Sequence, residues 1–275
     1  MRYNIKIRKR KENMEDRPIG MFDSGVGGLT VYKEIKEKLP HERIIYLGDT
    51  KEFPYGSKSK QSIIDLSKKN IEYLLKFNVK AIIIACGTAT SQALDTVKNM
   101  YDIPIIGIIE PTVNYIKEKK KYKDIGIIAT RGTIRSNTWE KELKAKIPDI
   151  NVYNKECPLL APMAEEGWTQ NEIAILTIKE YMKDFPKLDA LILGCTHYPL
   201  FENTIKKELA NVDIINTGKI IADYLYNNLY NNKSIKKELL INKTDEIYLT
   251  DTECNFVNVA NSILNCKVNI KHAKI

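Results

Sequence analysis

Two cysteines of this 275-residue chain stand in similar surroundings, in Ala85–Thr88 and in Gly194–His197. Each follows a short apolar run that is typical of a buried strand. The next helix should begin close by, where its N-terminal amides lower the pKa of a thiol. One thiolate can then remove a proton from a carbon acid while a thiol on the opposite face delivers another. Taken singly, Cys86 or Cys195 is better explained as an inert buried thiol, so the hypothesis of acid–base chemistry depends on the pair.

A glycine-rich loop, Asp23–Gly28 (DSGVGG), directly follows the first apolar run. It matches neither GxGxxG nor GxxxxGK followed by Ser or Thr, so the loop gives little support for a nucleotide. Its glycines let the backbone approach a small ligand at a helix N-terminus, where amide groups favour a carboxylate. Asp23 can accept an ammonium group or orient the nearer cysteine. A tight turn capped by Asp23 is the simpler alternative.

Three further positions carry polar groups that suit such a site. The segment Pro54–Gly56 follows the second apolar run and could place backbone amides and the Tyr55 phenol at a cleft mouth, although alone it indicates only a turn. Glu165 is either an acid–base auxiliary or an exposed carboxylate at a helix end. His197 is one of three histidines and stands two residues from Cys195, where an imidazole can tune or reprotonate the thiol.

Apolar runs alternate with amphipathic segments along most of the chain. Runs rich in Ile and Val that do not alternate with polar residues indicate strands buried on both faces, and hence a parallel sheet in an α/β protein. The runs are Ile19–Phe22, Ile44–Leu47, Ala81–Ala85, Ile105–Ile109, Ile125–Ala129, Ala190–Leu193, Val212–Ile215 and Ile247–Leu249. Between the second and third runs we expect a helix whose apolar face, at helical spacing, consists of Ile64, Ile71, Leu74 and Leu75.

The chain also repeats itself weakly. An apolar run beginning at Gly20 precedes Cys86 by 66 positions, and a similar run beginning at Gly126 precedes Cys195 by 69 positions. Ligand sites of parallel α/β sheets lie at the carboxyl ends of the strands. Two related α/β units that face each other would therefore bring two cysteines to one site from opposite sides.

Length and composition restrict the class of protein. A chain of 275 residues with 43% hydrophobic content can form one large core or two smaller ones. No stretch approaches the roughly 20 apolar residues that span a bilayer. Residues 1–17 lack the apolar region of a secretory signal, so we expect a cytoplasmic protein with no membrane partner. Five cysteines without a CxxC pair favour free thiols and give little support for a metal site.

The net charge of +8 raises the question of a nucleic-acid partner. Residues 1–17 form a basic N-terminal tail with seven Lys or Arg against three Asp or Glu, which accounts for half of the excess. The remainder is spread over lysine-rich faces such as Glu118–Asp124. This distribution is typical of solvated surface and disfavours nucleic-acid binding as the main function.

Taken together, several segments resemble the glutamate racemases of the cofactor-independent aspartate/glutamate racemase superfamily. The resemblance runs from about Pro18 to Leu225, and its segments are PIGMFDSGVGGLTV, YLGDTKEFPYGSKS, ACGTATS, PIIGIIEP, CPLLAPMAEEG and LILGCTHYPLF. It implies two pseudo-symmetric parallel-sheet α/β lobes with the active site in the cleft between them. The implied first lobe comprises residues 18–110 and 218–275, and the implied second lobe comprises residues 111–217.

The resemblance also implies the activity and its residues. The family interconverts L- and D-glutamate without a cofactor and supplies D-glutamate for peptidoglycan synthesis. Cys86 and Cys195 match its catalytic cysteines, and Asp23, Glu165 and His197 match residues that assist proton transfer. The matching substrate-binding positions are Asp23, Ser24, Tyr55, Gly56, Gly87, Thr88, Thr196 and His197. His197 after Cys–Thr favours glutamate over the related aspartate racemases, which tend to have a carboxylate there.

The chain departs from the family pattern at two places. Most members have Asn where this chain has Gly87, and an Asp–Ser–Gly is common where this chain has Asn216–Gly218. The second departure affects only a local turn. The first removes a substrate hydrogen bond but leaves a small space in which we expect a bridging water. Because one neutral hydrogen bond is worth about 0.5–1.5 kcal/mol, Gly87→Asn is expected to keep kcat within about tenfold.

Other functions remain open from the sequence. Within the superfamily, the alternative is an aspartate or broad-specificity amino-acid racemase. A cysteine hydrolase that uses Cys195 and His197 would have no need of Cys86. A non-catalytic paralogue, binding another protein through its basic surface, would need neither thiol. The sequence does not set the oligomeric state, and a homodimer is compatible with it.

The basic tail offers a direct test of where the function lies. Deletion of Met1–Asp16 should leave kcat and KM for glutamate unchanged, because no candidate catalytic residue precedes Asp23. Steady-state kinetics of the full-length and shortened proteins make the comparison. A large loss of turnover in a shortened protein that keeps its circular dichroism spectrum would mean that the tail reaches the active site.

Overall fold

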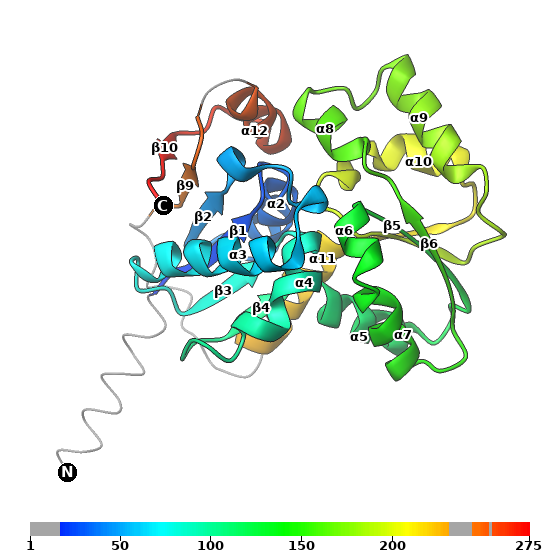
Figure 1. Cartoon of the computed structure of the whole chain (residues 1–275), viewed down its shortest axis with the longest axis horizontal. Coiled ribbons are helices and arrows are strands. Elements are labelled where there is room, and N and C mark those ends of the chain that lie inside the picture. Colours follow the sequence, from blue (N-terminus) through cyan, green and yellow to red (C-terminus); the bar gives the residue numbers. More distant parts are fainter. Residues whose placement is uncertain (1–16, 231–243, 253–254) are drawn as a thin grey trace, which may run out of the picture.

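The computed structural model describes residues 17–230, 244–252 and 255–275. Residues 1–16 of the basic tail and Cys254 lie outside the described residues. Figure 1 shows two α/β units side by side. We call the six-stranded sheet with the helices that cover it the first lobe, and the four-stranded sheet with its helices the second lobe. This arrangement confirms the expected fold of two parallel-sheet α/β lobes.

The first lobe is built on a sheet of order β10-β9-β2-β1-β3-β4, in which every pair of neighbouring strands is parallel. Its strands are β1 (Ile19–Asp23), β2 (Ile44–Gly48), β3 (Ala81–Ile84), β4 (Ile105–Gly107), β9 (Glu246–Leu249) and β10 (Ile270–His272). The three central strands β1, β2 and β3 are buried at every residue, as the unbroken apolar runs predicted. The sheet therefore lies inside its lobe with helices on both faces.

The second lobe repeats this pattern with a parallel sheet of order β6-β5-β7-β8. Its strands are β5 (Asp124–Ala129), β6 (Asn151–Glu156), β7 (Ala190–Leu193) and β8 (Asp213–Asn216). The order β2-β1-β3-β4 in the first lobe corresponds strand by strand to β6-β5-β7-β8 in the second. Strands β3 and β7 thus hold equivalent places, and each leads into one of the two cysteines. The repeat inferred from the sequence is confirmed at the level of topology.

The helices connect the strands and form the outer layers. They are α2 (Leu29–Lys38), α3 (Lys60–Leu75), α4 (Gly87–Val97), α5 (Ile109–Lys119), α6 (Arg131–Arg135), α7 (Thr138–Lys146), α8 (Leu160–Glu165), α9 (Glu172–Met182), α10 (Glu202–Glu208), α11 (Thr217–Leu225) and α12 (Phe256–Leu264). Helix α3 is the predicted helix, and it buries Ile64, Ile71 and Leu74 while Leu75 is half-buried. Ser59 caps this helix by accepting a hydrogen bond from the amide of Ser62.

The strand predictions are confirmed at all eight apolar runs, to within one or two residues at the strand ends. Strand β4 ends at Gly107 because the chain turns there into α5. Strands β6 and β10 were not predicted. Both are edge strands with half-exposed or exposed residues, so neither has an unbroken apolar run. Among the described residues, no helix has the length and apolar character needed to cross a bilayer.

The lobes are joined through α5 and α11, which pack against each other while α11 also packs on α2 (Figure 1). The last strand of the second sheet leads directly into α11, and the chain then returns to the first sheet as β9 and β10. The lobe boundaries expected near residues 110 and 218 stay predictions.

Glu246 ties this returning segment to the first sheet. Its carboxylate accepts hydrogen bonds from Lys271 Nζ at 2.6 Å, Tyr248 Oη at 2.7 Å and Arg43 Nη2 at 2.6 Å. Lys271 foremost, with Tyr248 and Arg43, lowers the pKa of Glu246 from 4.5 to about 2. The side chain therefore links β9 to its neighbour β10 and to the start of β2.

This lowered pKa predicts a pH-dependent contribution to stability. A carboxyl whose pKa is lowered in the folded state stabilises the fold above its unfolded pKa, and this contribution is lost as the pH falls through the folded pKa. Glu246→Gln should therefore unfold more easily than the wild type at pH 7, and the difference should shrink between pH 4.5 and about 2. Urea unfolding at a series of pH values measures this, with Glu118→Gln on the exposed surface as the matched control. A difference that does not depend on pH would contradict the assignment.

Candidate active site

The two cysteines lie at equivalent ends of β3 and β7, and both are almost fully buried. Cys86 occupies the N-cap of α4, where its Sγ accepts a hydrogen bond from the Ala89 amide at 3.5 Å. The Cys86 thiol also donates to Ser24 Oγ at 3.7 Å. Ser24 follows β1, which pairs with β3, so both residues come to the same edge of the first sheet. The loop after the first strand thus contacts Cys86 through Ser24.

Asp23 joins the two lobes at this edge. Its carboxylate accepts a hydrogen bond from Thr196 Oγ1 of the second lobe at 3.1 Å and another from the Gly25 amide at 3.2 Å. Burial raises the pKa of Asp23 to about 6, although the positive charge of His197 opposes the rise. Asp23, one of the residues that could orient the nearer cysteine, thus also contacts Thr196, which directly follows Cys195.

Glu165, His197 and Cys195 form a buried chain of polar contacts in the second lobe. His197 Nε2 lies 2.6 Å from Glu165 Oε1, and His197 Nδ1 lies 3.6 Å from Cys195 Sγ. Burial by itself lowers the pKa of His197, but Glu165 and Cys195 together raise it well above its ordinary 6.5. The resulting imidazolium stabilises negative charge on the neighbouring sulfur. Glu165 is buried, so the alternative of an exposed helix-end carboxylate is wrong.

The first cysteine has a different electrostatic environment. Burial, followed by the negative charge of Asp23, raises the pKa of Cys86 to about 12, which outweighs the hydrogen bond from the Ala89 amide. The expectation that a helix N-terminus lowers this pKa is therefore wrong for the closed arrangement, because removal from water is the larger effect. This environment favours a neutral thiol at Cys86, whereas Cys195 Sγ lies beside the imidazole of His197.

Hydroxyl groups from both lobes gather beside the cysteines. Thr88 Oγ1 lies 2.9 Å from Thr130 Oγ1 and 3.2 Å from Thr133 Oγ1, and the last two are 2.9 Å apart. Sequence reasoning named Thr88 but missed the two second-lobe threonines. The repeat contained the signal, since Thr130 follows Gly126 by the same four positions that separate Ser24 from Gly20. Three mutually bonded hydroxyls can reorient toward a ligand carboxylate.

The loop that carries Tyr55 and Gly56 differs from expectation in one respect. Tyr55 is fully buried, and its hydroxyl donates to Asp49 Oδ2 at 2.5 Å and accepts from Asn70 at 2.9 Å. The phenol therefore lies inside the lobe and not at a cleft mouth, and its hydrogen bonds to Asp49 and Asn70 hold the loop in place. Gly56 faces Thr130 of the second lobe. A contact of either residue with substrate stays a prediction.

Space beside Gly87 is also less than expected. A Cβ built on Gly87 would collide with the backbone carbonyl oxygen of Gly194 in the second lobe. The expectation of a small water-sized space there, and with it the expected tolerance of asparagine, is wrong for this closed arrangement. The other departure from the family is simpler, because Asn216 caps α11 by accepting a hydrogen bond from the Gly218 amide at 2.9 Å.

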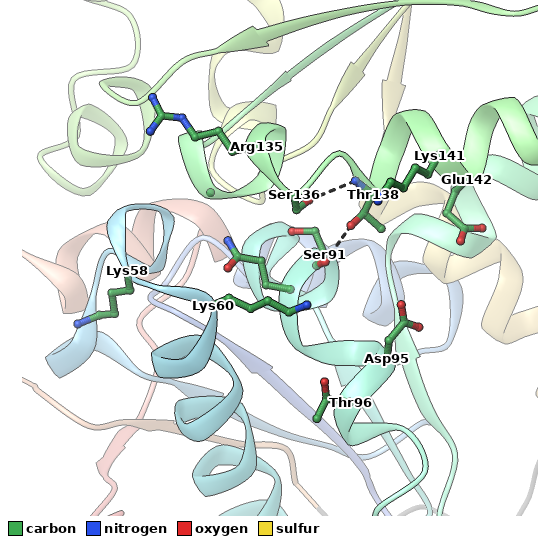
Figure 2. Close-up of a pocket in the computed structure, with 12 residues that line it drawn as sticks. Lys58, Lys60, Ser91, Asp95, Thr96, Arg135, Ser136, Thr138, Lys141 and Glu142 are labelled. Atoms are coloured by element: carbon green, nitrogen blue, oxygen red, sulfur yellow. Dashed lines mark hydrogen bonds between the residues drawn. The ribbon is translucent and has the colours of Figure 1, made fainter.

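A separate cavity of about 490 Å³ opens where α4 faces α6 and α7 (Figure 2). It contains neither cysteine. Its lining is polar and mixed in charge: Lys58, Lys60, Arg135 and Lys141 are basic, and Asp95 and Glu142 are acidic. A hydrogen bond from Thr138 Oγ1 to the Ser91 carbonyl crosses from one lobe to the other at its edge. The cavity therefore lies along the junction of the lobes but outside the group of residues described above.

Comparison with known proteins agrees with this arrangement. Residues 19–225 match the family model for Asp/Glu/hydantoin racemases. A glutamate racemase from a Sulfurihydrogenibium species is 44% identical over 94% of this chain and 96% of its own length. The chain therefore belongs to the Asp/Glu racemase family and is an isomerase of the racemase class.

Solved structures show the same relationship. A glutamate racemase from Francisella tularensis, crystallised with D-glutamate, superposes with a TM-score of 0.86 at 36% identity over 94% of this chain and 98% of that one. A glutamate racemase isoform from Bacillus anthracis superposes with a TM-score of 0.87 at 34% identity over 95% of this chain and 98% of that one. An aspartate racemase from Picrophilus torridus, at 17% identity and a TM-score of 0.60, shares the fold alone.

The raised pKa of Asp23 predicts that ionisation of this side chain makes the folded protein less stable. A carboxyl whose pKa is raised from 3.8 to about 6 binds its proton more tightly when folded, so stability falls as the pH rises between these values. Asp23→Asn removes that penalty and should stabilise the protein above pH 6 by at most about 3 kcal/mol. Below pH 4 the gain should vanish. Chemical unfolding across this pH range, with exposed Asp102→Asn as the control, tests the assignment, and a variant less stable than the wild type at pH 8 would contradict it.

Proposed function

We propose that this protein interconverts L- and D-glutamate by proton transfer at the α-carbon between two thiols. One observation carries the proposal: Cys86 and Cys195 occupy equivalent strand ends of two facing lobes, and Asp23 and Thr196 connect their surroundings. Inversion of a carbon centre needs a base on one face and an acid on the other, and two facing lobes supply both. The glutamate racemases among the relatives support glutamate as substrate.

The proposed reaction exchanges the roles of the two sulfurs. A thiolate at Cys195, stabilised by the His197 imidazolium, removes the α-proton, while the Cys86 thiol delivers its proton to the opposite face. The products are the inverted amino acid, a Cys195 thiol and a Cys86 thiolate. In the reverse direction Cys86 is the base and Cys195 the acid. The hydrogen bonds that Cys86 Sγ makes with Ser24 and the Ala89 amide can both be donated to its thiolate.

Substrate recognition is assigned to the polar groups around the sulfurs. Hydroxyls of Ser24, Thr88 and Thr196 can donate to the two carboxylates, and Asp23 can accept from the α-ammonium. Thr130 and Thr133 extend this set from the second lobe. The proposed cellular role is the supply of D-glutamate for peptidoglycan in the cytoplasm. No partner beyond the substrate is required for this chemistry.

An aspartate or broad-specificity racemase is the second candidate. By the family resemblance, a histidine at residue 197 favours glutamate, because the related aspartate racemases tend to have a carboxylate there. In this structure His197 contacts Glu165. A cysteine hydrolase based on Cys195 and His197 is less well supported, because it gives no role to Cys86, which occupies the place in the first lobe that Cys195 occupies in the second.

The decisive experiment incubates the protein with L-glutamate, and separately with L-aspartate, in D₂O without pyridoxal phosphate. Optical rotation should decay to zero for glutamate, with deuterium appearing at the α-carbon, and should remain constant for aspartate. Chelators should have no effect on the rate. Inversion of aspartate at a similar rate would establish broad specificity, and a chelator-sensitive rate would indicate a metal site.

Single substitutions test the two-thiol mechanism. Cys86→Ser and Cys195→Ser should each abolish racemization with the fold retained, because a serine hydroxyl is several pKa units too weak an acid to supply the base. Cys266→Ser is the matched control, since this cysteine is exposed and distant in sequence from both strand ends. Near-wild-type turnover in either active-site variant would exclude the mechanism, and hydrolase activity retained by Cys86→Ser would favour the alternative.

A further inference from the structure

At Gly87 the backbones of the two lobes come so close together that an added Cβ would collide with a carbonyl oxygen of the second lobe. It immediately follows Cys86, and the carbonyl group that it faces belongs to Gly194, which immediately precedes Cys195. The contact therefore joins the two chain positions adjacent to the sulfurs. Any change in the distance between Gly87 and Gly194 is passed directly to the distance between Cys86 and Cys195.

The same turn of α4 contacts the second lobe at two further residues. Thr88 Oγ1 lies within hydrogen-bond distance of Thr130 and Thr133, and the Ser91 carbonyl accepts from Thr138 Oγ1 at 2.9 Å (Figure 2). Residues 87, 88 and 91 span a single turn of the helix. The start of α4 is thus held against the second lobe by three adjacent contacts, and it cannot move at one without disturbing the others.

Gly87 differs from Gly25 and Gly27, two other glycines at this junction. An added Cβ would also approach the second lobe at these two residues, but it would meet the outer atoms of the Glu165 and His197 side chains there. Such side chains can change rotamer. At Gly87 the obstacle is a carbonyl within the backbone between β7 and Cys195, and its own strand is held in the sheet by a hydrogen bond from the Gly194 amide to the Ile128 carbonyl. The obstacle can yield only if the lobes separate.

We propose that Gly87 is a positioning residue whose missing side chain sets how far the two lobes close, and hence how the two thiols face the α-carbon. This inference rests on the proposed racemase function for its kinetic consequence. A methyl group needs about 3.5 Å from a neighbouring atom. An alanine at residue 87 therefore requires the two lobes to move apart at this contact by on the order of 1 Å. A misplacement of about 1 Å between catalytic groups can cost roughly 10²-fold in rate.

The test compares Gly87→Ala with Gly132→Ala. Gly132 lies at the same junction, but its added Cβ would meet the flexible end of Gln92 and would lie 3.0 Å from the Gly56 carbonyl, so a small adjustment is enough. We expect kcat for glutamate to fall by roughly 10²-fold in Gly87→Ala, with a smaller rise in KM, and to change little in Gly132→Ala. Gly87→Asn should be at least as impaired as Gly87→Ala.

Fluorescence provides a readout of closure that does not depend on turnover. The chain has two tryptophans: Trp168, which is 47% exposed, and Trp139, which is buried with its indole nitrogen beside Gly194. In a Trp168→Phe background, emission reports Trp139 alone. Gly87→Ala should shift this emission to the red, because separation of the lobes admits water near the indole, whereas Gly132→Ala should not.

Each outcome decides the proposal. A low kcat together with red-shifted Trp139 emission and an unchanged circular dichroism spectrum supports it. Equal kcat and equal emission in the two alanine variants overturns it, as does loss of the fold in Gly87→Ala, since alanine is otherwise the better residue in a helix. If the wild type does not racemize glutamate, the proposed function fails, but the emission comparison still decides whether Gly87 sets closure.

Discussion

The arrangement of this protein depends on two buried carboxylates that accept hydrogen bonds across the junction of the two lobes. Asp23 belongs to the first lobe and accepts a hydrogen bond from Thr196 of the second. Glu165 belongs to the second lobe and accepts one from the Val26 amide of the first, at 3.3 Å. A buried carboxylate without partners is strongly unfavourable, so each lobe stabilises charge that the other has buried. The buried ionisable groups therefore have these hydrogen-bond partners only when the two lobes are packed together.

Equivalent strand positions do not give the two thiols equivalent chemistry. The shared strand order places Cys86 after β3 and Cys195 after β7. The residues around them are not repeated: His197 contacts the second sulfur, whereas burial and then the negative charge of Asp23 raise the pKa of the first. The fold supplies the two-sided geometry, and the residues that are not repeated make the surroundings of the two sulfurs different. In the proposed reaction the first property serves both directions, and the second distinguishes the two thiols.

The first lobe has an additional support that the second lacks. Its sheet is extended by β9 and β10 from the end of the chain, and Thr250 after β9 donates a hydrogen bond to Asp49 at 3.0 Å. The same carboxylate accepts from Tyr55, whose loop carries Gly56 to the lobe junction. A segment some 200 residues away in sequence thus positions a loop beside the site. The same contacts explain why the Tyr55 phenol is buried in the lobe.

The sequence by itself determined the fold class, the parallel sheets and the equivalent strand-end positions of Cys86 and Cys195, because each follows from local patterns of apolar residues and from a repeat. It could not reveal edge strands such as β6, where polar residues break the pattern. Only the tertiary structure decided that burial outweighs the helix N-terminus at Cys86, that Thr130 and Thr133 join Thr88, and that Gly87 has no free space. Each of these depends on how closely segments far apart in sequence pack together. Desolvation and steric contact act over a few ångströms, a scale that spacing along the chain does not encode.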